Sequence, residues 1–339
     1  MATKALAIKY RPATWNDVVE QNSTVIILQQ QLESNEVKNA YLFCGPAGCG
    51  KTTCARIFAK EINKGDGNPI ELDAASNNGV DDVREIIQQA KTKSLDSEYK
   101  IFILDECHAL SNSAWQAMLK IIEEPPAKSI FIFCTTDPQK IPKTIISRVQ
   151  RYDFHRISQQ AIVDRLRYIC DREVISEDGI VRLEALEYIA KIADGGMRDA
   201  ITLLDKCLAY SSELTLGNVV DALGTVDYNV MMEFTYNLVK GLKKEAVAQI
   251  EALYNNGKDM KQFIKSYMNF LIDVSKFCLG CDWKYISIPK LADYEMWLNK
   301  ISKTDWLNMP ILDSIVKLNA DIKYSSSVKY DIEASILLM

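Results

Sequence analysis

The most informative run of this sequence is Gly45-Pro46-Ala47-Gly48-Cys49-Gly50-Lys51-Thr52. An apolar run at 40–44 precedes it, and a helix-like run at 53–60 follows it. Strand, glycine-rich turn and helix N-terminus in this order are typical of a loop that binds phosphate groups. The backbone N–H groups wrap the phosphates, Lys51 adds a positive charge at the β- and γ-phosphates, and the Thr52 hydroxyl can ligate Mg²⁺. The loop therefore predicts a nucleoside triphosphate ligand, without saying what its energy drives.

The composition limits the class of protein. A chain of 339 residues with 48% apolar and 25% charged residues predicts two or three ordinary globular domains. Its 45 acidic and 40 basic residues give a net charge of −5, which argues against a polyanion binder held by bulk charge. No long apolar span or secretory signal is visible, and the nine cysteines are scattered. We therefore expect a cytoplasmic protein with reduced thiols and no membrane association.

Alternating apolar runs and helical stretches between residues 37 and 155 predict an α/β domain with a parallel sheet. Because their apolar character is nearly continuous, the expected strands should be covered on both faces; they are 40–44, 70–72, 101–104 and 130–135. Beyond 154 the pattern becomes helical, with the clearest helices at 160–172, 183–193, 198–210, 229–240, 244–255 and 258–279. The glycines at 195–196 and 224 mark the expected breaks between helical segments in this half of the chain. The expected domains are 1–157, 158–223 and 224–339.

Two carboxylates follow the apolar run at 101–104. A parallel strand would place Asp105 at the carboxyl edge of the sheet, where open α/β folds bind nucleotides. There Asp105 would join the magnesium shell, and Glu106 would orient or deprotonate the attacking water. An isolated Asp-Glu pair would instead be read as a solvated strand end. Their position about 50 residues after the phosphate loop favours the catalytic interpretation.

Three further features gain meaning only from this context. Thr135 and Thr136 end another apolar strand and could touch a γ-phosphate or hold a water, or could simply form a turn. Arg148 could be a surface charge, or an arginine finger of the kind that stabilises phosphoryl transfer. Arg198, after the glycine pair, could fold over the nucleotide, or could be a solvated charge beside a helix cap.

Taken in order, these elements resemble the AAA+ ATPases. Within them the match is close to the clamp-loader family of the bacterial DNA polymerase III gamma/tau type, and looser to the small subunits of replication factor C. The runs that carry the resemblance are Lys9-Tyr10-Arg11-Pro12, Trp15-Asn16-Asp17-Val18-Val19, Glu71-Leu72-Asp73-Ala74-Ala75-Ser76, Leu119-Lys120-Ile121-Ile122-Glu123-Glu124-Pro125-Pro126 and Thr135-Thr136-Asp137-Pro138-Gln139-Lys140-Ile141-Pro142. The similarity covers essentially the whole chain.

The resemblance implies a P-loop AAA+ domain at 1–157, a helical lid at 158–223 and an all-α collar for oligomerisation at 224–339. It implies an ATPase that is the motor of a replication clamp loader. Its partners would be the other subunits of a five-membered ring, a sliding clamp and primer–template DNA, recognised by backbone and shape. ATP with Mg²⁺ would bind at subunit interfaces.

The resemblance also assigns roles to residues. Asp105 would bind magnesium, and Glu106 would activate the attacking water. Thr136 (less favourably Thr135) would be the first sensor of the γ-phosphate, and Arg198 would be the second. Arg148 would act in trans, on the ATP of the neighbouring subunit. The nucleotide pocket would comprise Ala7, Arg11, Pro12 and Val19 around the adenine, with Gly45, Pro46, Ala47, Gly48, Cys49, Gly50, Lys51, Thr52 and Thr53 around the phosphates.

The chain departs from the family pattern in ways that affect metals and thiols. Family members usually carry a four-cysteine zinc module after the phosphate-loop helix, whereas residues 63–69 contain no cysteine, so we expect no zinc site. Cys278 and Cys281 lack a second ligand pair nearby and are interpreted as core or helix-end thiols. Cys49 lies near positive charge, which predicts a thiol reactive toward alkylating agents. Glu20 replaces a common glycine, and a tau-type extension is not expected.

Two other functions remain open. The chain could be another AAA+ machine acting on DNA, such as a branch-migration motor, which should carry a winged helix, or a helicase loader. It could also be a non-enzymatic loader subunit, although such subunits typically lose the lysine or the acidic pair retained here. For DNA contact, the segment Ser76-Asn77-Asn78-Gly79 is the best candidate, with an ordinary turn and helix cap as the equal alternative.

Overall fold

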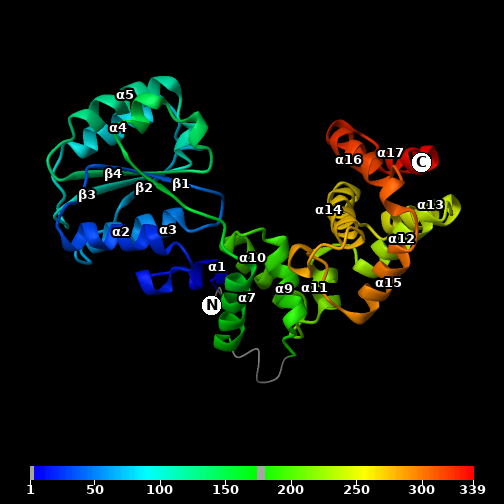
Figure 1. The fold of residues 1–339 in the computed structure, drawn as a ribbon. Helices are drawn as coiled ribbons and strands as arrows, with labels where there is room; N and C mark the ends of the chain where they lie inside the picture. The colour runs from blue at the N-terminus through cyan, green and yellow to red at the C-terminus, as the bar shows by residue number, and fades with distance from the viewer. Residues whose placement is uncertain (1–3, 174–179) are drawn as a thin grey trace. The chain divides into compact units, whose positions relative to one another are not determined.

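The computed structural model describes residues 4–173 and 180–339, and the chain divides into two compact units (Figure 1). The first unit comprises Met1–Arg172 with Ile192–Asp205, and the second Glu173–Lys191 with Lys206–Met339. Within the described ranges, no helix has both the length and the apolar character needed to cross a membrane. The three-domain division expected from the sequence stays a prediction.

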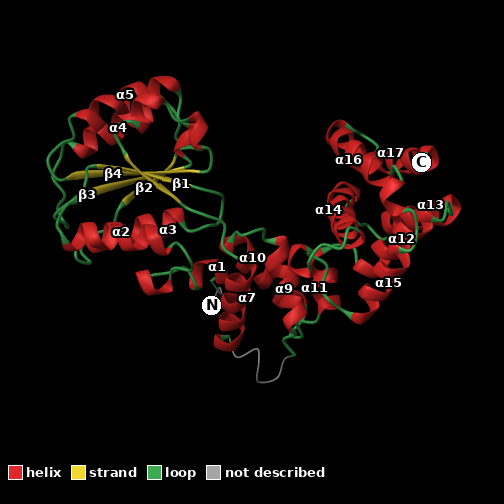
Figure 2. Ribbon diagram, viewed as in Figure 1, coloured by secondary structure: helices red, strands yellow, loops and turns green. Residues whose placement is uncertain are grey.

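The first unit is an α/β domain (Figure 2). Its helices and strands are α1 Leu6–Lys9, α2 Asn22–Glu33, β1 Ala40–Cys44, α3 Lys51–Ile62, β2 Ile70–Asp73, α4 Val80–Ala90, β3 Lys100–Asp105, α5 Asn112–Glu123, β4 Ser129–Thr135, α6 Lys143–Ile146, β5 Gln150–Asp153 and α7 Gln159–Arg172. Most of α10, Met197–Tyr210, also belongs to this unit.

All five strands are parallel, in the order β2-β3-β4-β1-β5. In the register of the sheet, Leu42 on β1 faces Phe133 on β4 and Arg151 on β5. Because parallel strands end at a common edge, the segments that follow β1, β3 and β4 are brought together there. The predicted parallel sheet covered by helices is confirmed.

Helices cover both faces of the sheet, with α4 and α5 on one side and α2 and α3 on the other (Figure 2). On the first face Phe102, Phe131 and Phe133 pack with Trp115 and Met118. The opposite core is a second aromatic cluster that includes Tyr41, Phe43 and Phe58. Burial of each such side chain stabilises the fold by about 1.5–3 kcal/mol, so the sheet is a rigid support for its carboxyl edge.

Two strands differ from expectation. β2 was expected to be buried on both faces, but it is an edge strand whose residues alternate between half-buried and exposed. The strand β5 was not predicted, because Gln150-Arg151-Tyr152-Asp153 is polar except for Tyr152, which turns into the core. Both errors have one cause: an edge strand buries alternate residues and carries no continuous apolar run.

In the part that the structure describes, the second unit consists of helices and their connections, with one isolated β-bridge between Val181 and Leu214. Its helices are α9 Leu183–Ile192, α11 Leu216–Leu223, α12 Tyr228–Val239, α13 Lys243–Asn255, α14 Met260–Cys278, α15 Ala292–Ser302, α16 Ile311–Asp321 and α17 Val328–Leu338. The predicted helical character of this half of the chain is confirmed.

Lys191 is a half-buried cation in the second unit. Its amine donates a hydrogen bond to the Tyr228 hydroxyl and lies 4.8 Å from the centroid of that ring. Burial lowers the pKa of Lys191 from 10.5 to about 8, although the Asp273 carboxylate opposes the shift. The folded protein therefore holds this proton less tightly than the unfolded chain does.

This predicts an unusual dependence of stability on pH. Between about pH 8 and pH 10 the unfolded state binds more protons at Lys191, so the contribution of this side chain to the free energy of unfolding should rise with pH, by up to ~3 kcal/mol. Lys191→Met should remove this rise, whereas Lys258→Met, which loses a bond to the Thr225 carbonyl, should keep it. Urea denaturation at pH 7.5 and 9.5 tests this; an unchanged pH dependence in Lys191→Met would contradict it.

Candidate functional site

The glycine-rich loop connects β1 to α3, whose first residue is Lys51. Gly50 caps the helix with φ of +104°, a conformation that L-residues with side chains rarely adopt. Gly48 has φ of +71°, and a Cβ there would come within 2.9 Å of the Cα of Gly196. The loop therefore packs against the glycine pair before α10, and its N–H groups lie at a helix N-terminus suited to phosphate.

Lys51 is only 6% exposed. Its ammonium donates to the carbonyl oxygens of Gly45 and Pro46, each at 2.8 Å. The loop thus folds back over its own lysine and holds the charge in place with neutral acceptors. A phosphate oxygen is a stronger, charged acceptor for the same donor.

Thr52 and Asp105 are brought together, as the sequence predicts. The Thr52 hydroxyl donates to Oδ2 of Asp105 at 2.7 Å, which joins the start of α3 to the end of β3. A hydroxyl and a carboxylate are hard oxygen ligands of the kind that Mg²⁺ takes together with substrate phosphates. The donor set therefore fits Mg²⁺ bound with a nucleoside triphosphate.

Glu106 follows Asp105 in the left-handed region, with φ of +46°. Its N–H donates to Oδ1 of Asp105 at 3.0 Å. Its Oε2 accepts from the Thr136 hydroxyl at 2.8 Å and from the Thr136 N–H at 3.3 Å. The candidate water-orienting carboxylate and the candidate sensor are therefore direct partners, and an uncommon backbone conformation aims Glu106 toward the end of β4.

Arg11, Thr53 and Arg198 belong to one neighbourhood. The Arg11 guanidinium donates to the Thr53 hydroxyl at 3.2 Å. Burial lowers the pKa of Arg11, and the charges of Arg56 and Arg198 add to this effect. Arg198 is exposed in the first turn of α10. Cations gathered beside a phosphate loop favour binding of an anion.

Arg148 has partners away from the loop. Its Nε donates to Oε1 of Glu123 at 2.7 Å, and its Nη1 donates to the Thr144 carbonyl at 2.8 Å. The side chain of Arg148 is 39% exposed. Arg148 therefore lies on the surface beside α5 and α6, and its partners there are not the loop residues of its own chain.

The remaining predicted adenine contacts, Ala7, Pro12 and Val19, are half-buried in the N-terminal segment. Three hydrogen-bonded contacts hold this segment against α7 and α10. The Leu6 N–H donates to Asp205 at 3.1 Å, Arg165 donates to the Tyr10 carbonyl at 3.1 Å, and Ser158 donates to Glu20 through its N–H at 2.7 Å and its hydroxyl at 2.6 Å. The acidic side chain at position 20 thus stabilises the N-terminus of α7.

The predicted reactivity of Cys49 is wrong. The residue is 1% exposed, and burial raises the pKa of its thiol in spite of the nearby Lys51 charge. A protonated, inaccessible thiol reacts poorly with alkylating agents. The sequence shows the charge beside Cys49 but does not show that its side chain turns into the core.

Cys278 is the last residue of α14, and Cys281 is exposed just beyond it. Within residues 4–173 and 180–339, no group of three or more His, Cys, Asp or Glu side chains is arranged to hold a metal ion. The expected absence of zinc stays a prediction.

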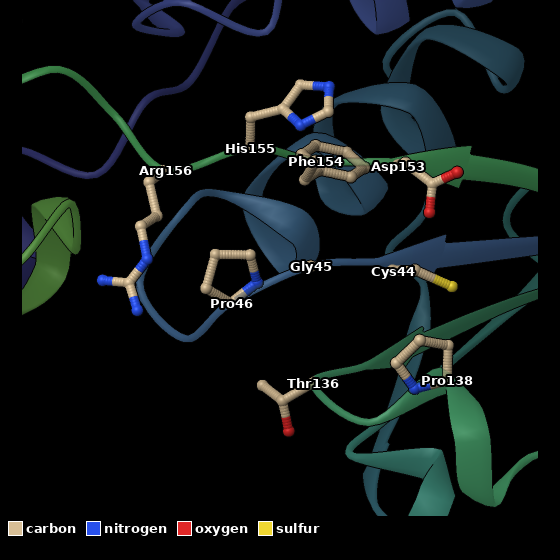
Figure 3. A pocket seen from close by; sticks show the side chains of 9 residues that line it. All are labelled: Cys44, Gly45, Pro46, Thr136, Pro138, Asp153, Phe154, His155 and Arg156. Carbon is tan, nitrogen blue, oxygen red and sulfur yellow. The ribbon is translucent and has the colours of Figure 1, made fainter.

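A pocket of about 580 Å³ opens beside the loop. Figure 3 shows Thr136 on one side of Pro46, and Phe154 and His155 on the other. The pocket is therefore lined by the first loop residues, the end of β4 and the segment after β5. The remaining lining residues are Cys44, Gly45, Pro138, Asp153 and Arg156.

Two residues that the sequence did not single out contact the predicted site. Gln21 is 7% exposed; its amide donates to the His155 carbonyl at 2.7 Å and lies 3.5 Å from the Cys49 carbonyl. His108 lies beside Glu106, with Nδ1 at 3.2 Å from Oε2. Neither belongs to a motif that the sequence analysis used, and the only signal for His108 is its position two residues after Glu106.

Comparison with known families gives two matches. Residues 70–158 match the family described as DNA polymerase III, delta subunit. Residues 161–213 match the DNA polymerase III clamp loader subunit, ATPase lid domain. The first range covers β2 to β5, with Asp105, Glu106 and Arg148, and the second covers α7 to α10, with Arg198.

Curated relatives agree with these matches. The tau subunit of DNA polymerase III from Bacillus subtilis is 40% identical over 81% of this chain and 52% of its own length. The gamma/tau subunit of Mycobacterium tuberculosis is 34% identical over 76% of this chain and 48% of its own length. The chain thus spans about half the length of these relatives. The gamma subunit of Buchnera aphidicola is 29% identical over 99% of this chain and 98% of its own length.

Among solved structures, the RuvB Holliday junction branch migration motor of Thermotoga maritima is similar, with a TM-score of 0.53 at 17% identity. The likeness covers 86% of this chain and 91% of that one, and at this identity it shows the fold alone. The sequence matches decide the family. The chain belongs to the AAA+ clamp-loader ATPases and resembles the gamma/tau subunit of bacterial DNA polymerase III.

Proposed function

We propose that this chain is an ATP-hydrolysing motor subunit of a clamp loader, working in the cytoplasm within a five-subunit ring. It would open a sliding clamp and load it onto primer–template DNA. One observation carries the proposal: Lys51, Thr52, Asp105 and Glu106 meet at one sheet edge, while Arg148 is paired elsewhere on the surface. A nucleotide site that holds its own lysine and carboxylates, while Arg148 of the same chain is paired elsewhere, is one that the Arg148 of a neighbouring subunit would complete.

Each side chain then has a role in hydrolysis. Lys51 and the N-terminus of α3 bind the phosphates, and Arg11 and Arg198 add positive charge beside them. Thr52 and Asp105 would hold Mg²⁺, which supplies charge stabilisation at the phosphates when it is bound. Glu106 orients the water, and Thr136 contacts the γ-phosphate. The adenine would lie against Ala7, Pro12 and Val19.

Arg148 would act on the ATP of the next subunit. Its exposed position beside α6 supports this role, because a finger that acts in trans has to lie on a surface. The pocket beside Pro46 and Thr136 supports the same role, because a neighbour's guanidinium would have room to approach the loop there. Hydrolysis is then expected only in the assembled ring.

Primer–template DNA would be bound through its backbone. Ser76 and Asn78 are exposed before α4, and the Gly79 N–H at its start is capped by Asp82 at 3.0 Å. Small polar groups at a helix N-terminus suit contact with phosphate at any sequence. The Asp82 cap uses one of these donors, so Ser76 and Asn78 are the proposed contacts.

The decisive assay measures ATP hydrolysis with and without the cognate sliding clamp and primed DNA. We expect clamp and primed DNA together to raise the turnover of the assembled loader. Lys51→Ala should weaken ATP binding by roughly 10–100-fold or more, because it removes a charge-assisted donor. Lys60→Ala, an exposed lysine on the same helix, should bind ATP normally. A rate that clamp and primed DNA leave unchanged would contradict the clamp-loader assignment.

A further inference from the structure

His108 lies between Glu106 and Thr135. It belongs to a short 3-10 turn, Cys107–Ala109, directly after the left-handed Glu106. Its Nδ1 is 3.2 Å from Oε2 of Glu106 and 3.1 Å from Oγ1 of Thr135. The imidazole is 21% exposed, and Thr135 is fully buried. The imidazole of His108 is therefore held between the buried Thr135 hydroxyl and the Glu106 carboxylate, which is proposed to orient the attacking water.

The hydrogen-bond partners of His108 determine which nitrogen of its imidazole carries the hydrogen. An ionised carboxylate can only accept, so Nδ1 has to be the donor toward Glu106. The Thr135 hydroxyl already accepts from the Asp137 N–H at 3.0 Å, which fixes it in place at the end of β4. Nδ1–H is thus shared between two acceptors, and the same Oε2 also receives both Thr136 donors.

We propose that His108 is a positioning residue for ATP hydrolysis, which with Thr136 aims the Glu106 carboxylate at the attacking water. The inference rests on the proposed function. The inference goes beyond that function because the Thr136 hydroxyl has two acceptors to which it can donate, Glu106 and the γ-phosphate of bound ATP. Once the Thr136 hydroxyl turns to phosphate, His108 remains as the side-chain donor that holds Glu106.

The proposal predicts different rates for His108→Asn and His108→Gln, which both introduce an amide. The amide nitrogen of asparagine stands two bonds beyond Cβ, as Nδ1 does, whereas that of glutamine stands one bond further, as Nε2 does. We expect His108→Ala to lower kcat about 10–100-fold with unchanged affinity for ATP. His108→Asn should recover most of the rate, and His108→Gln should not.

A double-variant cycle separates positioning from a general structural role. If His108 acts through Glu106, adding His108→Ala to Glu106→Gln should change the residual rate by less than about twofold. Equal losses in both backgrounds, or equal rates for the Asn and Gln variants, would overturn the inference. If the wild-type loader hydrolyses ATP and Glu106→Gln does not, but His108→Ala is fully active, this inference alone fails. A fully active Glu106→Gln would overturn the role of Glu106 and this inference with it, whereas a wild type without ATPase activity would overturn the proposed function itself.

Discussion

Replacing Arg148 by alanine is expected to slow ATP turnover by roughly 10³–10⁵-fold while leaving ATP binding unchanged. The arginine makes its contacts with Glu123 and the Thr144 carbonyl, so its loss removes nothing that holds the loop of its own subunit. In the neighbour's site, the same guanidinium would stabilise the charge that develops on the transferred phosphoryl group. The expected change is about 4–7 kcal/mol in the barrier, all of it in kcat.

Two control variants make this result specific. Arg84→Ala removes an exposed arginine with a similar ion pair, to Asp81, and should keep the basal rate measured without DNA. Arg148→Lys keeps the charge but lacks the planar guanidinium, and should recover little of the rate. Loss of ATP binding in Arg148→Ala would place the residue in the site of its own subunit instead.

Glu106→Gln is expected to lower kcat by about 10²–10⁴-fold with ATP still bound. Glutamine has nearly the same shape, and its amide oxygen can still accept from Thr136, so the fold of the loop should persist. What it loses is the negative charge that orients and deprotonates water. The measurements are single-turnover hydrolysis and nucleotide affinity on the same preparation.

Glu61→Gln, an exposed substitution on α3, is the matched control and should have the wild-type rate. A Glu106→Gln variant that retains more than about a tenth of the rate would show that another group activates the water. Asp105 is the next candidate, because its Oδ2 accepts from Thr52 and its Oδ1 from the Glu106 N–H.

The sequence predicts the buried strands β1, β3 and β4 because each is a continuous apolar run, and in the second unit it predicts the helices α9, α12, α13 and α14 from their periodicity. At the sheet edges it predicts the strand β2 but not the exposure of that strand, and it misses β5. There, Glu71 on β2 is exposed and Arg151 on β5 forms an ion pair with Asp153 rather than a core contact. Which residues become an edge strand depends on what the neighbouring strand leaves unpaired, and a local pattern does not contain that information.

In the candidate site, too, some features could be predicted from the sequence and others could not. The residue types and spacing of Lys51, Thr52 and Asp105 predict their meeting, because one topology brings the ends of β1 and β3 together. The burial of Cys49 and the contact of His108 with Thr135 depend on side-chain directions across three elements. Sequence spacing specifies the edge where these groups gather, whereas packing specifies which of them touch.

If each ATP site is completed by the neighbouring subunit, two variants that are inactive alone should complement each other when they are mixed. Assembled with Glu106→Gln subunits, Arg148→Ala subunits keep an intact Glu106 and receive Arg148 from the neighbour, so part of the ATPase activity should return. A double variant, Glu106→Gln with Arg148→Ala, should give no recovery when mixed with Arg148→Ala, because no subunit then supplies the arginine. Failure of the first mixture to recover activity, in rings shown to contain both variants, would contradict the account.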